Sequence, residues 1–92
     1  MTLDIFKFKT DSRYFEKERD GIKNNTVREI DLNDSRFIKL ITYHQIGWNK
    51  DDIFIELYCE DVHPFRIVRS IRDISIWNNL MVITWEHEEG KK

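Results

Sequence analysis

The sequence contains a single cysteine, a single proline and only three glycines among its 92 residues. Because Cys59 has no second cysteine to pair with, it cannot form an intramolecular disulfide, and a reducing compartment is expected. The scarcity of proline and glycine argues against a collagen-like or linker-dominated chain. The N-terminus lacks the positive and long apolar regions of a signal peptide, and apolar runs such as residues 80–83 are far too short to span a bilayer. We therefore expect a cytoplasmic protein with no membrane span and no membrane partner.

The apolar content is sufficient for one compact core, since 40% of the residues are hydrophobic and 13% are aromatic. A chain of 92 residues would leave each of two domains too small, so we expect a single domain over residues 1–88 and a frayed tail over residues 89–92. The formal net charge of −2 provides no overall attraction to phosphate. It is still compatible with a local basic face, which would combine the N-terminal half with Arg66, Arg69 and Arg72.

Alternation of apolar and polar residues predicts that most of the chain is β structure. The alternating runs, taken as six short strands, cover residues 3–9, 26–30, 37–44, 53–59, 65–74 and 81–86. One helix is predicted over residues 11–20, between good N-cap residues and Gly21, which suits a left-handed C′ position.

The connections suggest how these strands pair. We expect residues 37–44 and 53–59 to pair antiparallel through a hairpin at residues 47–51, whose glycine would supply an unusual φ. A bulge is expected at residues 69–70 and a tight turn at residues 78–79. The pattern predicts an α+β domain that is mainly β, with a small curved antiparallel sheet or incomplete barrel and one early helix, because closing a sheet removes exposed edges.

One short motif, G-x-K-x-x-T-x-R, brings chemically active side chains together at the start of the second predicted strand. It consists of Gly21, Lys23, Thr26 and Arg28. Residues two apart in a strand point to the same face, so Thr26 and Arg28 should project together while Lys23 approaches from the preceding turn. A planar guanidinium suits a carbonyl, phosphate or carboxylate, which makes this motif a candidate ligand site.

The segment 14–28 resembles the helix-to-strand element of ASCH domains, a branch of the PUA-like superfamily, which typically reads G-x-K-x-x-E-x-R. The threonine variant is similar to the small bacterial amidohydrolases of that family that deacetylate N4-acetylcytidine. The resemblance implies a PUA-like fold and a domain that binds RNA or a nucleotide-like ligand in a cleft between the early helix and the sheet. Gly21, Lys23, Thr26 and Arg28 would line that cleft. The size would also suit a small phage or bacterial accessory protein.

Two other functions remain open. In the first, a small amidohydrolase acts on an acylated nucleoside, with Thr26 as nucleophile, Lys23 as its activator and Arg28 holding the substrate, as the resemblance implies. The family's catalytic glutamate comes from a longer insertion before the final strand, whereas here residues 73–79 are short and contain no glutamate. The carboxylates weighed as substitutes are Glu29, Glu56, Glu60 and Asp61, and their spacing selects none of them.

In the second, the domain is a protein-interaction module whose exposed aromatics meet another chain. An ordinary structural role is also open for the motif: a helix cap for Gly21, a solvated turn for Lys23, a strand former for Thr26 and a surface ion pair for Arg28.

The remaining residues that could carry chemistry favour structural roles. Cys59 and His63 have no second close ligand pair of the kind that marks a zinc site, so neither a metal nor a cofactor is expected. Cys59 is better explained as a small buried apolar residue, and Trp85 as core or half-core. Aromatic residues around the predicted hairpin, Tyr43, Trp48 and Tyr58, would form a stacking platform or pack across strands.

Overall fold

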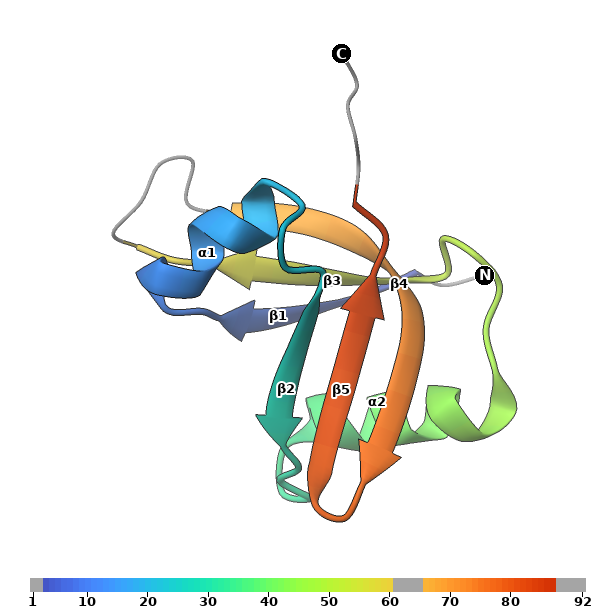
Figure 1. Ribbon diagram of the computed structural model, residues 1–92. Helices are drawn as coiled ribbons and strands as arrows, with labels where there is room; N and C mark the ends of the chain where they lie inside the picture. The colour runs from blue at the N-terminus through green and yellow to red at the C-terminus, as the bar shows by residue number, and fades with distance from the viewer. Residues whose placement is uncertain (1–2, 61–65, 88–92) are drawn as a thin grey trace.

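The computed structural model describes residues 3–60 and 66–87 (Figure 1). The expected tail over 89–92 and the expected beginning of a strand at residue 65 lie outside the described residues. The elements are, in chain order, β1 (Asp4–Lys9), α1 (Ser12–Arg19), β2 (Asn25–Glu29), α2 (Ser35–Ile46), β3 (Ile53–Tyr58), β4 (Arg66–Trp77) and β5 (Leu80–Trp85).

The fold is α+β and mainly β, with one curled five-stranded sheet that forms a half-barrel (Figure 1). The strand order is β1-β3-β4-β5-β2, so β1 and β2 are the two edges. The long strand β4 pairs with β3 through its first half and with β5 through its second half. Its register against β5 shifts between Ile71 and Asp73, which places the expected bulge two residues further along the chain than residues 69–70. This irregularity lets one strand serve both halves of the sheet, because a bulge bends and twists the strand that carries it.

The strand predicted over residues 37–44 is wrong, since this segment belongs to α2. Asp34 caps the helix by accepting a hydrogen bond from the backbone N–H of Arg36 at 3.0 Å. Phe37 and Leu40, three residues apart, are both buried on the same side of the helix. The β-branched and aromatic residues of this segment favoured a strand, but burial of that helical face outweighs a weak intrinsic preference.

The predicted hairpin between residues 37–44 and 53–59 is therefore also wrong. Gly47 does have a positive φ of 86°, but at the C-terminal cap of α2. The chain then returns to β3, which pairs with β1 in parallel and with β4 antiparallel. The sheet is thus mixed rather than purely antiparallel, and the domain has five strands and two helices within the described chain.

The core lies between the concave face of the sheet and the two helices. Its buried side chains are Phe6, Phe8, Phe15, Phe37, Leu40, Ile53, Ile55, Leu57, Cys59, Ile67, Ile71, Ile74, Met81, Ile83 and Trp85. The expected core positions of Cys59 and Trp85 are confirmed, at 3% and 2% exposure.

Helix α1 agrees closely with its prediction. Asp11 is the N-cap and accepts from the backbone N–H of Arg13 at 2.8 Å. The helix ends at Arg19, and Gly21 then has a φ of 83°, in the left-handed region expected at C′. Phe15 and Glu18 form its buried face, three residues apart. Neither helix of the described chain is both long and apolar enough to cross a membrane.

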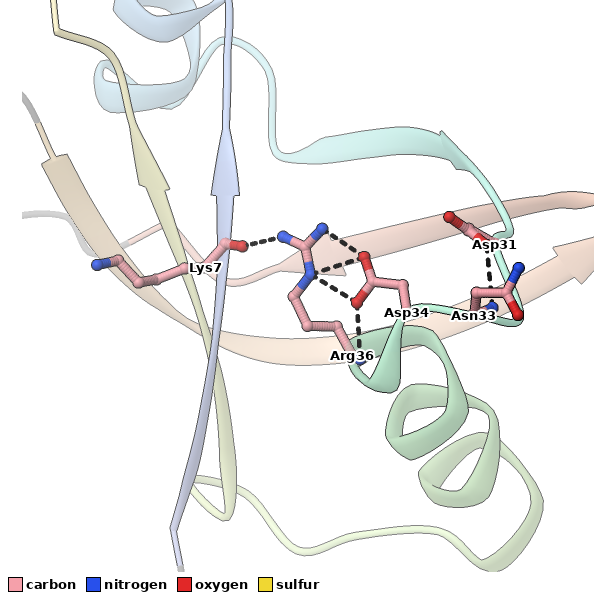
Figure 2. A network of polar contacts seen from close by, with 5 residues as sticks. All are labelled: Lys7, Asp31, Asn33, Asp34 and Arg36. Carbon is pink, nitrogen blue, oxygen red and sulfur yellow. Dashed lines mark hydrogen bonds and ion pairs between the residues drawn. The ribbon is translucent and has the colours of Figure 1, made fainter.

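Two arginine side chains reach backbone carbonyls on the open edge of β1, one from helix α2 and one from strand β2. Arg36, at the start of α2, donates to the carbonyl of Lys7 on β1 and holds the Asp34 carboxylate with its Nε and Nη2 (Figure 2). Arg28, on β2, donates through Nη2 to the carbonyl of Lys9 at 3.0 Å. Side chains therefore satisfy edge carbonyls of β1 that have no neighbouring strand on this side. The Arg28 contact also links β1 to β2, where the candidate site lies.

Candidate functional site

A hollow of about 440 Å³ opens between the end of β1, helix α1 and the edge strand β2. Its lining residues come from all three elements and the turn between them: Lys9, Thr10, Asp11, Tyr14, Glu18, Lys23, Asn25, Thr26, Val27 and Arg28. The sequence motif is thus brought together as three of its four residues, Lys23, Thr26 and Arg28, line one hollow.

Thr26 and Arg28 share the inward face of β2. They lie opposite Ile83 and Met81 of β5, both of which are buried. Arg28 donates through Nε to the Thr26 hydroxyl oxygen at 3.0 Å, so Thr26 keeps its own proton to donate. The Arg28 guanidinium also lies 5.0 Å from the centre of the Phe8 ring, in the range of a cation–π contact.

Arg28 is a partly desolvated cation. Burial lowers its pKa, the nearby Arg36 acts in the same direction, and Glu18 opposes both. Arginine stays protonated at neutral pH, so the side chain brings a positive charge into a place where water screens it poorly. Nη1 makes no hydrogen bond within the described chain and is left to donate to a ligand.

Lys23 comes from the turn before β2 and is held by three groups. Its Nζ donates to Glu18 Oε2 at 3.2 Å and to the backbone carbonyl of Asn25 at 2.5 Å. The same Nζ lies 5.5 Å from the centre of the Tyr14 ring. An ammonium has three donors, so one N–H remains for a ligand. Lys23 makes no hydrogen bond with Thr26 in the described part of the chain.

Glu18 is a buried residue of the hollow that the sequence motif does not include. It is only 1% exposed, and its second carboxylate oxygen, Oε1, accepts from the Thr10 hydroxyl at 3.0 Å. Charged residues surround Glu18 in the sequence, and such a run does not by itself indicate a buried carboxylate. Its spacing from Phe15 was the available signal, because residues three apart lie on one side of a helix.

None of the described carboxylates named above as substitutes for the catalytic glutamate lines this hollow. Glu29, Glu56 and Glu60 lie elsewhere, and Asp61 is outside the described residues. Among its lining residues the hollow therefore combines two threonine hydroxyls, two lysine ammonium groups, one guanidinium and the buried carboxylate of Glu18, with the exposed carboxylate of Asp11 at its edge.

Gly21 shapes the site without lining it. A Cβ at this position would lie 2.8 to 2.9 Å from ring atoms of His87, closer than real Cβ contacts allow. Together with its positive φ, this contact favours glycine here. The close packing of His87 on Gly21 fixes the turn that leads into Lys23.

The rim of the hollow is partly apolar. Tyr14 is 44% exposed on α1, and Val27 is 56% exposed on β2. A half-exposed aromatic ring beside donor groups is suited to stacking on a flat ligand while the donors fix its orientation.

The aromatic platform considered from the sequence does not form. Tyr43 lies in α2, packs edge-on against Phe6 with ring centres 6.4 Å apart, and donates to Asp4 at 2.6 Å. Trp48 donates its indole N–H to the carbonyl of Ile71 at 3.0 Å. Tyr43 and Trp48 therefore make separate contacts, while the ring centre of Tyr58 lies 5.8 Å from the Lys7 ammonium.

The three arginines of β4 do not form a basic row either. Arg66 lies 3.8 Å from Glu56 and Arg72 lies 3.1 Å from Glu86, so carboxylates neutralise both. Arg69 turns toward α1 and donates to the carbonyl of Arg19 at 3.3 Å. The three arginines of β4 therefore contact three different groups on different parts of the fold.

Within residues 3–60 and 66–87, no three His, Cys, Asp or Glu side chains gather as they would around a metal ion. A comparison with models of known protein families matches none of them, and a comparison with curated proteins finds no sequence of significant similarity.

Proposed function

We propose that this protein is a PUA-like domain of the ASCH type that binds a nucleotide-like unit, either free or as part of RNA, in the hollow between α1 and β2. The observation that carries the proposal is the convergence of Lys23, Thr26 and Arg28 on one hollow of about 440 Å³. Cavities of about 300 to 1,000 Å³ are typical of small-molecule sites.

Each lining group has a role in this proposal. Arg28 offers the unused nitrogen Nη1 to a phosphate or a base carbonyl, and Lys23 offers its third N–H. The Thr26 hydroxyl donates to an acceptor on the ligand. The Tyr14 ring stacks on the base, which is how proteins commonly hold unpaired bases of RNA.

The test measures the affinity of a panel of nucleotides and short single-stranded RNAs for the protein by fluorescence anisotropy. We expect Arg28→Ala to weaken binding by about tenfold or more, since a charge-assisted contact is lost. Arg72→Ala is the matched control, because it removes an exposed arginine that does not line the hollow. Arg28→Lys separates charge from the planar geometry of the donors.

Two results would contradict the binding proposal. One is the absence of binding to every nucleotide and RNA of the panel. The other is an equal affinity of the Arg28→Ala and Arg72→Ala variants, provided that circular dichroism shows both to be folded.

A second candidate function is supported by Glu18. A small amidohydrolase needs a carboxylate near its hydroxyl nucleophile and its lysine, and the sequence alone offered none. Glu18 lines the same hollow as Thr26 and holds Lys23 at 3.2 Å. In this hypothesis the Thr26 oxygen attacks the amide carbonyl while Arg28 holds the carbonyl oxygen. The C–N bond then breaks, and the amine leaves with the proton that the Thr26 hydroxyl has lost. Water finally hydrolyses the acyl-threonine ester, which releases the acid and restores the Thr26 hydroxyl.

The enzyme hypothesis is tested by incubating the protein with N4-acetylcytidine and following the appearance of cytidine by chromatography. Turnover that disappears in Thr26→Val, while nucleoside binding persists, would support it. No turnover by the wild-type protein would exclude deacetylation of this nucleoside and leave the binding proposal in place.

A further inference from the structure

The convex face of strands β2, β5 and β4 is a separate surface from the hollow. The cross-strand registers place nine side chains on it, and all nine are exposed or half-buried. They are Asn25, Val27 and Glu29 on β2, Leu80, Val82 and Thr84 on β5, and Asp73, Ser75 and Trp77 on β4. We call this surface the outer face.

An apolar strip runs obliquely across the outer face. Trp77 pairs directly with Leu80 across the β4–β5 hairpin, and Val27 pairs directly with Val82 between β2 and β5. Leu80 and Val82 are two residues apart on β5, so they lie on the same side and join the two pairs. Trp77 is 70% exposed and Val27 is 56% exposed, so the strip is open to water.

Neither helix of the described chain covers this strip. Figure 1 shows α2 behind β2, β5 and β4, where Phe37 and Leu40 enter the core, and α1 beside the other end of the sheet. The near side of these three strands in that view is free of both helices. A large exposed aromatic side chain within an apolar strip is typical of a protein-binding surface, where tryptophan is often the dominant contact.

The charges of the outer face indicate the kind of partner. Of its nine side chains only Glu29 and Asp73 are charged, and both are acidic. Two carboxylates without a cation on the same face repel a phosphate backbone. They would also meet their own copies if two identical faces packed together. A partner that presents lysine or arginine beside an apolar side chain fits the face instead.

We propose that the outer face docks a basic segment of another protein, with Trp77 as the central anchor and Glu29 and Asp73 as the flanking acidic contacts. This interaction is distinct from the proposed ligand site, because Trp77, Glu29 and Asp73 do not line the hollow. Asn25 and Val27 belong to both surfaces, since they also line the hollow.

The experiment selects binding peptides from a random twelve-residue display library against the whole protein and measures their affinity by fluorescence anisotropy. We expect the selected peptides to be rich in lysine or arginine and to contain at least one large apolar residue. Trp77→Ser should weaken their binding by about tenfold or more, as expected for an anchor. The matched control is Ile46→Ser, because Ile46 is 73% exposed but lies on α2, away from the outer face.

The double variant Glu29→Gln and Asp73→Asn tests the charge component. It should reduce affinity severalfold and flatten the dependence of affinity on salt, because rim charges act mainly through long-range attraction. Both positions are exposed, so the fold should be retained, and circular dichroism of each variant checks this.

Each other outcome overturns the proposal. Selected peptides that are acidic or uncharged, or that bind Trp77→Ser as tightly as the wild type, would exclude a basic partner on this face. A dimer seen by sedimentation that dissociates in Trp77→Ser would assign the face to a second copy of the chain. RNA binding that is lost in Trp77→Ser but kept in Arg28→Ala would assign it to nucleic acid.

Discussion

The Lys23–Glu18 ion pair should couple the stability of the domain to the geometry of its candidate site. Lys23→Met removes the cation but keeps most of the side-chain length, so that the Glu18 carboxylate retains only the Thr10 hydroxyl as a partner. Breaking a fully buried pair costs about 3 to 5 kcal/mol. Because the Lys23 side chain is 28% exposed and only Glu18 is fully buried, water screens the pair, and we expect a loss of about 2 kcal/mol.

Substitution of the other partner of the ion pair should cost less stability. In Glu18→Gln, the amide oxygen still accepts from Thr10, and the half-buried ammonium of Lys23 can turn toward water. We expect a loss of about 1 kcal/mol. The double variant contains no buried charge, so its loss should be smaller than the sum of the single losses by about 1 to 2 kcal/mol.

Urea unfolding at neutral pH measures the free energy of unfolding of the wild type, the two single variants and the double variant. Tryptophan fluorescence is a suitable signal, because Trp85 is buried at 2% exposure and becomes hydrated on unfolding. For a small domain the slope is about 1 kcal/mol per molar urea, so Lys23→Met should lower the midpoint by about 2 M. A Lys23→Met variant as stable as the wild type, or a double variant whose loss equals the sum, would refute the coupling of this pair.

Three further predictions concern the framework around the site. Gly21→Ala should lower the free energy of unfolding by about 1 to 2 kcal/mol, because the residue has a φ of 83° and its Cβ would collide with His87. Acid should destabilise Asp34→Asn less steeply than the wild type. Hydrogen bonds from Arg36 lower the pKa of Asp34 in the folded state. The carboxylate therefore stabilises the fold above its ordinary pKa of about 4, and this stabilisation is lost as the pH falls through the folded-state pKa. Phe8→Ala should cost about 3 to 5 kcal/mol, because this ring is 2% exposed and packs beneath two guanidinium groups.

Urea and acid unfolding curves measure these three effects. His87→Ala should relieve part of the Gly21→Ala penalty, and a penalty that stays unchanged in the double variant would assign all of it to backbone strain. Asparagine still caps helices well, so parallel acid curves for Asp34→Asn and the wild type would show that the carboxylate contributes nothing in the acid range. A loss below about 1 kcal/mol in Phe8→Ala would contradict the packing described for that ring.

Local signals in the sequence predicted those parts of the fold that depend on neighbouring residues. The helix after β1 has its cap at Asp11 and its glycine at residue 21, and the turn at residues 78–79 leads into β5 as expected. The failure at residues 37–44 shows the limit of this reasoning. Phe37, Leu40 and Ile41 have helical spacing, but the aromatic and β-branched composition of the segment also suits a strand, and only packing against the sheet decides between the two.

The candidate site likewise contains some residues that local sequence signals predict and one, Glu18, that they do not. The two-residue spacing of Thr26 and Arg28 predicts that they share one face of a strand. The position of Lys23 in the turn before that strand predicts that it approaches them. Glu18 could not be selected in the same manner. Glu18 can be buried because Thr10 and Lys23, which flank α1 in the sequence, contact its carboxylate. These contacts depend on how α1 packs against the rest of the fold.

The amino-acid sequence by itself determined the mainly β, α+β fold class, the ends of α1 and the shared face of the motif residues, because these follow from periodicity, capping and turn chemistry within a few residues. The tertiary structure decided the parallel pairing of β1 with β3, the helical state of α2, the arginine contacts with the open edge of β1 and the burial of Glu18. Each of these joins segments far apart in the chain. These contacts are stabilised by the burial of apolar surface and by hydrogen bonds to backbone groups, neither of which a local sequence pattern reveals.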